Sequence, residues 1–265
     1  MKIGMSIFGE ISHEKVASLL KKNGIDRSFI GSETEDFDGV MKIFAENGIT
    51  METLHAPFQG INGMWSDDDA MGNAMLVRLF DSVDKCAKYG IPTTIVHVSS
   101  GRPMPEINQK GIERYEKLFC YAKEKGVKVA LENLRYLENL KYFMDRYDFP
   151  VFCWDTGHEN CYTDNINHME YFADRLGALH IHDNRGIKDV DDHLLPYDGN
   201  IDFEAVAKHI ATSGKDITIM LEICRSTKTD GKPFYGDISD EEYVERAVSA
   251  AKKIAARVDE LREKA

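Results

Sequence analysis

The chain has 265 residues, a hydrophobic fraction of 43% and a formal net charge of −12 at pH 7. This length can bury a full core, and no run approaches the roughly 20 apolar residues of a membrane-spanning helix. The acidic balance disfavours nucleic acid and anionic membrane as partners, because both are polyanionic.

The cysteines and the N-terminus indicate a cytoplasmic protein. Five cysteines lie scattered along the chain without a C-x-x-C pair, which argues against a disulfide framework and against a thiolate zinc site. The first residues, M-K-I-G-M-S-I-F-G-E, have too short and interrupted an apolar part for a signal peptide. We therefore expect reduced thiols in a cytoplasmic chain.

Eight short apolar runs, rich in β-branched residues, are the expected strands. They occur near residues 2–8, 27–31, 49–54, 93–98, 127–132, 150–154, 177–182 and 216–222. Helical patterns separate them, over about 13–23, 36–47, 69–89, 106–125, 138–147, 166–175, 203–213 and 240–262. Glycines end the first four helices, at Gly24, Gly48, Gly90 and Gly126, as expected of units that alternate a helix with a parallel strand.

This alternation predicts an α/β fold: a single (β/α)₈ TIM barrel, forming one domain over residues 1–265. A doubly wound open sheet would have the same alternation. However, no G-x-G-x-x-G follows the first expected strand, and polar residues follow strands along the whole chain rather than at two adjacent crossovers.

Ionisable residues end nearly all of the later strands. They are His55, His97, Glu132, Asp155 with His158, His180 with His182, and Glu222. In a barrel the carboxyl ends of the strands meet at one mouth, so residues far apart in the sequence come together there. The pattern is therefore typical of a metalloenzyme.

Four of these residues form the expected metal site: Glu132, Asp155, His180 and Glu222. Two Glu, one Asp and one His are a mostly oxygen donor set, which suits Mn²⁺, Mg²⁺ or Co²⁺ and also accommodates Zn²⁺. Buried carboxylates without a balancing cation each cost several kcal/mol. We therefore expect this quartet to bind a divalent metal.

Four motifs resemble the xylose-isomerase-like barrels, which include ketose epimerases, inosose isomerases and dehydratases, and endonuclease IV. The motifs are L-E-N-L at 131–134, W-D-T-G-H at 154–158, L-H-I-H-D-N at 179–184 and D-D-H-L-L-P-Y-D-G-N-I-D-F at 191–203. The resemblance implies that the quartet binds one metal and that Glu132 and Glu222 shuttle a proton on opposite faces of a ketose. It also implies that His158 contacts a substrate oxygen, and Arg185 is placed to do the same.

The primary interpretation is a divalent-metal-dependent isomerase or epimerase acting on a small sugar or sugar derivative, by proton abstraction beside a carbonyl. The alternative is an endonuclease-IV-like phosphodiesterase with several zinc ions that cleaves DNA at abasic sites. The chain has a candidate for each of that enzyme's nine ligands, including a D-x-H pair at Asp191 and His193. Residues expected to bind substrate or additional metal are His55, His97, His158, His182, Arg185, Asp191 and His193.

The charge of the expected mouth loops favours a sugar over DNA as the substrate. The expected mouth loops read S-E-T-E-D-F-D at 32–38, S-D-D-D at 66–69 and D-V-D-D at 189–192, whereas a DNA enzyme depends on Lys and Arg contacts to phosphates. The sugar stays open, since Arg225, Lys228 and Lys232 would allow a phosphorylated one. Isomerisation, epimerisation and dehydration also stay open. The C-terminal amphipathic helix suits either the barrel's last helix or a contact in a homo-oligomer.

Overall fold

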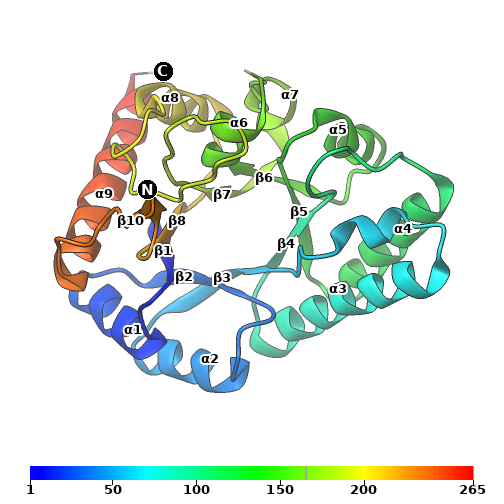
Figure 1. Cartoon of the computed structure of the whole chain (residues 1–265), viewed down its shortest axis with the longest axis horizontal. Coiled ribbons are helices and arrows are strands. Elements are labelled where there is room, and N and C mark those ends of the chain that lie inside the picture. Colours follow the sequence, from blue (N-terminus) through cyan, green and yellow to red (C-terminus); the bar gives the residue numbers. More distant parts are fainter. Residues whose placement is uncertain (165, 265) are drawn as a thin grey trace. The chain divides into compact units, whose positions relative to one another are not determined.

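The structure is a computed structural model that describes residues 1–164 and 166–264, and it alternates strands with helices (Figure 1). The strands are β1 (Ile3–Phe8), β2 (Arg27–Gly31), β3 (Thr50–His55), β4 (Thr93–His97), β5 (Lys128–Glu132), β6 (Val151–Asp155), β7 (Leu176–His180), β8 (Ile219–Cys224), β9 (Lys228–Thr229) and β10 (Lys232–Pro233). The helices are α1 (His13–Lys22), α2 (Phe37–Glu46), η1 (Ile61–Trp65), α3 (Asp69–Tyr89), α4 (Gln109–Glu124), α5 (Leu137–Arg146), α6 (Thr156–Tyr162), α7 (Met169–Phe172), η2 (Ala173–Arg175), α8 (Phe203–Ser213) and α9 (Asp240–Glu263).

The sheet follows the order of the sequence. Strands β2 to β7 are hydrogen-bonded in the order β2-β3-β4-β5-β6-β7, and β1 pairs with β8. The pairs β1–β8, β3–β4, β4–β5 and β5–β6 are all parallel. The short β9 and β10 form a separate antiparallel hairpin. These parallel pairs of strands, with helices between successive strands of the chain, agree with the alternation that the sequence predicts.

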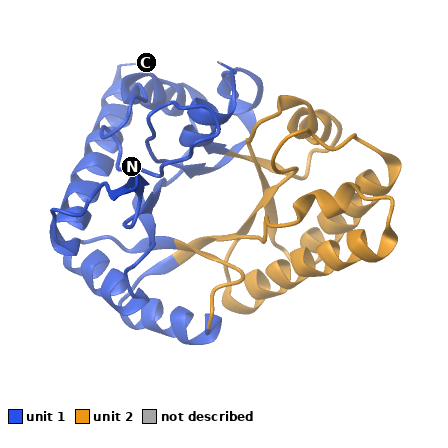
Figure 2. Ribbon diagram, in the orientation of Figure 1, with its two compact units in different colours: residues 1–28, 36–50, 154–265 blue, residues 29–35, 51–153 orange. Residues whose placement is uncertain are grey.

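The chain forms two compact units (Figure 2). Unit 1 comprises residues 1–28, 36–50 and 154–265, and unit 2 comprises residues 29–35 and 51–153. The expectation of a single domain over residues 1–265 stays a prediction.

In unit 2, strand pairing brings the carboxyl ends of β4 and β5 level. His97 lies opposite Glu132 in the parallel register. Behind the strands, the buried Trp65 donates its indole N–H to the Val98 carbonyl at 2.8 Å, and the buried Tyr115 ring packs against it. These aromatic contacts hold η1 and α4 on the unit's core.

In unit 1, β8 lies between β1 and the end of β7. Beyond β7, the Ile181 N–H donates to the Met220 carbonyl at 2.8 Å, and the Glu222 N–H donates to the Ile181 carbonyl at 3.1 Å. Helices α8 and α9 pack against each other (Figure 1). The buried stripe of α9 recurs every three or four residues, as the amphipathic sequence predicts; it comprises Tyr243, Val244, Ala247, Val248, Ala251, Ile254, Ala255 and Val258.

Three details differ from the sequence predictions. Strand β6 passes directly into α6, which is not among the expected helices. The Asp155 carboxylate caps this helix by accepting the His158 N–H at 2.6 Å. The helix expected over 166–175 is two short pieces, α7 and η2. Strand β8 extends to Cys224, so Glu222 lies inside the strand rather than at its end. Among the helices of residues 1–164 and 166–264, none has the length and apolar character needed to cross a bilayer.

Candidate functional site

Unit 2 brings together three of the predicted site residues, at the ends of three adjacent strands. The Glu132 side chain is fully buried, and one of its oxygens, Oε2, lies 2.8 Å from His97 Nε2 and 3.3 Å from His55 Nε2. These residues end β3, β4 and β5, and the parallel pairing of the strands makes them neighbours. We call His55, His97 and Glu132 the unit 2 trio. Two imidazoles and a carboxylate at this spacing are potential ligands for one metal ion.

An aromatic side chain lies beside the unit 2 trio. The Phe58 ring lies 5.7 Å from the ring of His55 and 5.2 Å from that of His97, measured between centroids. Phe58 follows β3 and is exposed. It offers an apolar surface next to the imidazoles, which suits the carbon face of a small ring.

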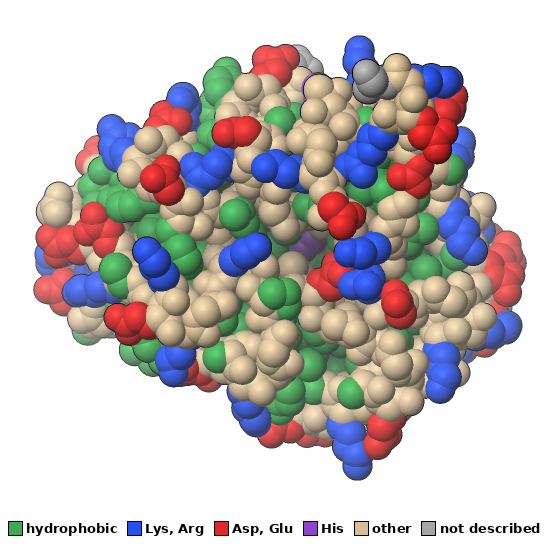
Figure 3. Space-filling view, turned by 180° about the vertical axis from the view of Figure 1, so that it is seen from behind, with side chains coloured by type: hydrophobic (Ala, Val, Ile, Leu, Met, Phe, Trp, Pro, Cys, Tyr) green, Lys and Arg blue, Asp and Glu red, His purple; other side chains and the backbone are tan. Residues whose placement is uncertain are grey.

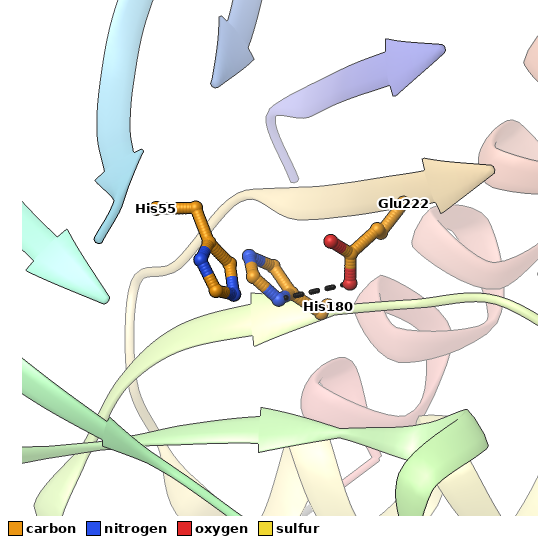
Figure 4. A group of neighbouring side chains, drawn as sticks. All are labelled: His55, His180 and Glu222. Carbon is orange, nitrogen blue, oxygen red and sulfur yellow. Dashed lines mark ion pairs between the residues drawn. The ribbon is translucent and has the colours of Figure 1, made fainter. Parts of the chain in front are cut away.

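In unit 1, three further members of the predicted quartet lie close together. His180 Nδ1 lies 3.1 Å from Glu222 Oε2 (Figure 4) and 4.0 Å from Asp155 Oδ2. Asp155 and His180 are fully buried, and the Glu222 side chain is nearly so. Two carboxylates at one buried imidazole form a strongly negative environment, which favours a cation.

Five residues of unit 1 form a second group, which we call the acid–histidine cluster: Asp155, His158, His182, Asp191 and His193. Asp155 Oδ1 lies 3.1 Å from His182 Nε2. Asp191 Oδ2 lies 3.2 Å from His158 Nε2 and 3.1 Å from His193 Nε2. Each carboxylate therefore faces imidazole nitrogens, and three-residue subsets of the cluster have metal-ligand spacing.

Ring stacking holds the three imidazoles of this cluster. The rings of His182 and His193 stack with their centroids 4.0 Å apart and their planes 25° apart. Tyr162, one helical turn after His158, stacks on the His158 ring at 4.9 Å and donates its hydroxyl to Asp191 at 3.4 Å. Tyr162 is not among the expected site residues, although its i+4 spacing from His158 is typical of two residues on one helical face.

The charges of the cluster shift two pKa values. Burial of His182 opposes its protonation, but the negative charges of Asp155 and Asp191 outweigh burial and raise the pKa of His182 to about 9. Burial opposes ionisation of Asp191, yet His182 and His193 hold the pKa of the Asp191 carboxyl well below its ordinary value. The cluster therefore pairs the ionised Asp191 carboxylate with an imidazolium, or with a metal in its place.

The loop after β7 carries much of this cluster and is fixed by Asp183. This fully buried carboxylate accepts four backbone N–H groups at 2.8–3.1 Å, from Asn184, Tyr197, Gly199 and Ile201. His193 and Tyr197 have positive φ, at 47° and 78°. Such backbone conformations are costly for non-glycine residues and occur where surrounding contacts impose them, often at functional sites.

Arg185, the predicted substrate contact, binds a carboxylate of the same loop. Its Nε lies 3.0 Å from Asp192 Oδ2 and its Nη2 lies 3.1 Å from Asp192 Oδ1. The sequence analysis did not single out Asp192, which is buried.

The predicted site residues thus fall into two sets. The unit 2 trio contains His55, His97 and Glu132, and unit 1 contains Asp155, His158, His180, His182, Arg185, Asp191, His193 and Glu222. Six of them lie in the carboxyl-terminal halves of strands, and the others lie in α6 or in the segment that follows β7. That Glu132 shares one metal with Asp155, His180 and Glu222 stays a prediction.

Parallel strands that alternate with helices and carry acids and histidines at their carboxyl ends define a class, the (β/α)₈ barrels with a polar mouth. Residues 22–254 match the xylose isomerase-like TIM barrel family, and the chain belongs to that family. The predicted family and fold class are confirmed.

Three similar proteins illustrate the family. The uncharacterized protein y4fM of Sinorhizobium fredii is 29% identical, over 84% of this chain and 76% of that protein. D-psicose 3-epimerase from Clostridium cellulolyticum H10, solved with D-tagatose, superposes with a TM-score of 0.77 at 18% identity, covering 97% of this chain and 99% of that one. The IOLI protein, solved with a bound zinc atom, superposes with a TM-score of 0.74 at 17% identity, covering 97% of this chain and 99% of that one. At these identities the two structures establish the fold alone.

Proposed function

We propose that the chain is a divalent-metal-dependent isomerase or epimerase acting on a small sugar. The observation that carries the proposal is the group in unit 1 formed by the buried Asp155 and His180 with Glu222. Glu132 is a further buried carboxylate at the end of β5. The similarity to a D-psicose 3-epimerase supports the sugar as substrate.

The donor chemistry fits a divalent metal. Three carboxylates and one imidazole match the ligand preferences of Mn²⁺, Mg²⁺, Co²⁺ and Zn²⁺. Asp155 and Glu222 place two carboxylates within 4.0 Å of the His180 imidazole, and their negative charge would stabilise a divalent cation. The zinc in the similar IOLI protein is consistent with such a site. We therefore assign Glu132, Asp155, His180 and Glu222 as the residues that would hold the metal.

Glu132 and Glu222 would move the proton. A bound metal acidifies the C–H next to a carbonyl by polarising the carbonyl oxygen. One glutamate removes that proton, and the other delivers a proton to the opposite face of the planar enediol. Two bases are needed because strand ends are rigid, so a single carboxylate does not reach both faces. Glu132 on β5 and Glu222 on β8 come from separate strands, as this requires.

The test combines metal content with proton exchange. Purified protein is analysed for metal by mass spectrometry and incubated in D₂O with D-fructose, D-tagatose and D-psicose, with and without Mn²⁺. We expect one equivalent of bound metal and metal-dependent deuterium incorporation beside the carbonyl. If neither these ketoses nor inososes and keto-glycosides exchange with any of the four metals, the proposal is wrong.

A second candidate function, phosphodiester hydrolysis at several metal ions, is favoured by one observation. His182 Nδ1 and Asp191 Oδ1 are buried, lie 3.6 Å apart and have no hydrogen-bond partner among the described residues. A further metal at the acid–histidine cluster would satisfy both atoms.

Charge weighs against a DNA substrate. On the face drawn in Figure 3, Lys and Arg side chains are interspersed with Asp and Glu, whereas DNA binding needs concentrated positive charge. His193→Ala separates the two functions. It should leave the metal content unchanged in a sugar enzyme, and lower it in a phosphodiesterase that also incises abasic-site DNA.

A further inference from the structure

Arg185 and Asp192 form a fixed ion pair in the loop after β7. Besides the two side-chain contacts, at 3.0 and 3.1 Å, the backbone N–H of Arg185 donates to Asp192 Oδ2 at 3.2 Å. The Asp192 side chain is 3% exposed and that of Arg185 is 30% exposed. A buried carboxylate that accepts both side-chain and backbone donors holds its partner in one orientation.

The pair is anchored to the candidate site on both sides. Asp192 lies between Asp191 and His193, two members of the acid–histidine cluster. Its backbone carbonyl accepts the Thr227 hydroxyl at 2.7 Å, from the segment after β8. Arg185 therefore projects from a loop that is tied to the ends of both β7 and β8, where barrels bind substrates.

Part of the guanidinium stays available to a ligand. Side-on pairing with Asp192 uses the N–H of Nε and one N–H of Nη2, so both N–H groups of Nη1 and the second of Nη2 remain. Within residues 1–164 and 166–264, no protein acceptor is found for these donors. They can donate to hydroxyl or carbonyl oxygens.

The charge of Arg185 is nevertheless neutralised. Asp192 balances it directly, and Asp230, in the turn between β9 and β10, adds further negative potential. Two neighbouring cations are also committed. Arg225 binds Asp240 at 2.8 Å and two backbone carbonyls, and Lys188 binds Asp164 at 3.0 Å. Among the described cations of the loops after β7 and β8, only Lys228 and Lys232 are left to bind a phosphate. Both are exposed and lie in the β9–β10 hairpin.

We propose that Asp192 is a positioning residue that turns Arg185 into a hydrogen-bond donor for an uncharged sugar and disfavours phosphorylated or acidic sugars. This rests on the proposed sugar isomerase or epimerase activity and narrows its substrate class. A neutral ion pair gains little from an anionic ligand, because the carboxylate of Asp192 repels the added negative charge while Arg185 attracts it.

The test compares Asp192→Asn, Arg185→Gln and the double variant with the wild type. Binding of D-fructose, D-fructose 6-phosphate and inorganic phosphate is measured by calorimetry. Removing the carboxylate should tighten phosphate and sugar-phosphate binding about tenfold and weaken D-fructose binding about fivefold, and the added Arg185→Gln change should abolish the gain for phosphate. The matched control is Asp216→Asn, which frees the exposed Lys2 at the amino ends of β1 and β8 and should change neither affinity.

Kinetics gives the readout that a merely structural role would not change. For Asp192→Asn, the KM for a neutral ketose should rise more than kcat falls, and Asp192→Glu should restore part of the affinity. Unchanged ligand preference in Asp192→Asn, or tight binding of phosphate by the wild type, would overturn the proposal. If Asp192→Asn does not fold, the proposal is tested by D-fructose binding to the Arg185→Gln variant. Unaltered D-fructose binding in that variant would contradict the role of the pair.

A failure of this proposal can be distinguished from a failure of the proposed isomerase or epimerase activity. A wild type that exchanges no ketose contradicts the isomerase or epimerase activity. The inorganic-phosphate titrations need no turnover, so they still report whether Asp192 sets the charge preference of Arg185.

Discussion

Gly157 lies against His182 with no room for a side chain. A Cβ added at Gly157 would come 1.9 Å from His182 Cε1 and 2.3 Å from its Nδ1. Gly157 is in the first turn of α6, between the Asp155 cap and His158. The missing Cβ therefore allows α6 and the buried His182 imidazole to occupy adjacent positions in the acid–histidine cluster.

Gly157→Ala should accordingly disrupt the cluster. The ring of His182 must move by more than an ångström or the helix must shift, and overpacking of this kind costs about 1–3 kcal/mol or more. We expect a lower melting temperature and weaker metal binding. Gly31→Ala is the control, because its Cβ would meet Thr34 Oγ1 at 3.7 Å, an ordinary contact. Equal melting temperatures for the two variants would contradict the packing argument.

Asp183→Asn should destabilise the loop after β7. The carboxylate accepts four backbone N–H groups, whereas an amide offers one oxygen and turns an NH₂ group towards donors. Losing charge-assisted bonds and leaving buried N–H groups unpaired should lower the free energy of unfolding by about 2–4 kcal/mol, measured by urea denaturation. Asp68→Asn, at the exposed cap of α3, should change it little, since Asn caps as well as Asp. A similar small effect at Asp183 would mean that water replaces the lost acceptor.

The cysteines should differ sharply in reactivity. Burial raises the pKa of the Cys86 thiol to about 12, so it stays protonated and shielded at pH 8 to 9. Cys120 is exposed. With iodoacetamide on the native protein at pH 8, mass mapping should find Cys120 modified long before Cys86. Full modification in urea is the control, and equal native rates would contradict the burial of Cys86.

Much of the fold could be predicted because each unit repeats the same local signals. The glycine stop at Gly90 is seen as expected at the end of α3. Helix α6 was missed because its cap is Asp155, which the sequence analysis assigned to the metal. One carboxylate serves both the helix and the cluster, and residue type alone does not reveal a double role.

The site residues could be named from strand ends, but their partners could not. His168 lies in the expected helix over 166–175, and nothing in that pattern indicates that it is buried with its Nδ1 2.8 Å from Glu159 Oε2. This contact depends on the fold and leaves no periodic signal. Two carboxylates of the acidic loop at 66–69 are also less available to a ligand than the sequence indicates. Asp68 caps α3, and Asp69 pairs with the buried Arg114.

The proton-transfer roles of Glu132 and Glu222 can be tested by single amide substitutions. Glu132→Gln and Glu222→Gln should each lower turnover about 10²- to 10⁴-fold, the usual contribution of a general acid or base. Each variant should keep deuterium exchange with only one of two epimeric ketoses, the one whose proton faces the remaining carboxylate. The two variants should therefore show opposite preferences, measured by NMR in D₂O with Mn²⁺.

Metal content and circular dichroism separate loss of the base from loss of the site. The exposed Glu204→Gln, which removes a surface ion pair with Arg257, should retain full turnover. If a metal-loaded Glu132→Gln or Glu222→Gln variant converts both epimers at near wild-type rate, that glutamate is not the base. If both variants exchange the same epimer, the proton of that epimer is removed in the absence of either glutamate, and the assignment of one carboxylate to each face is wrong.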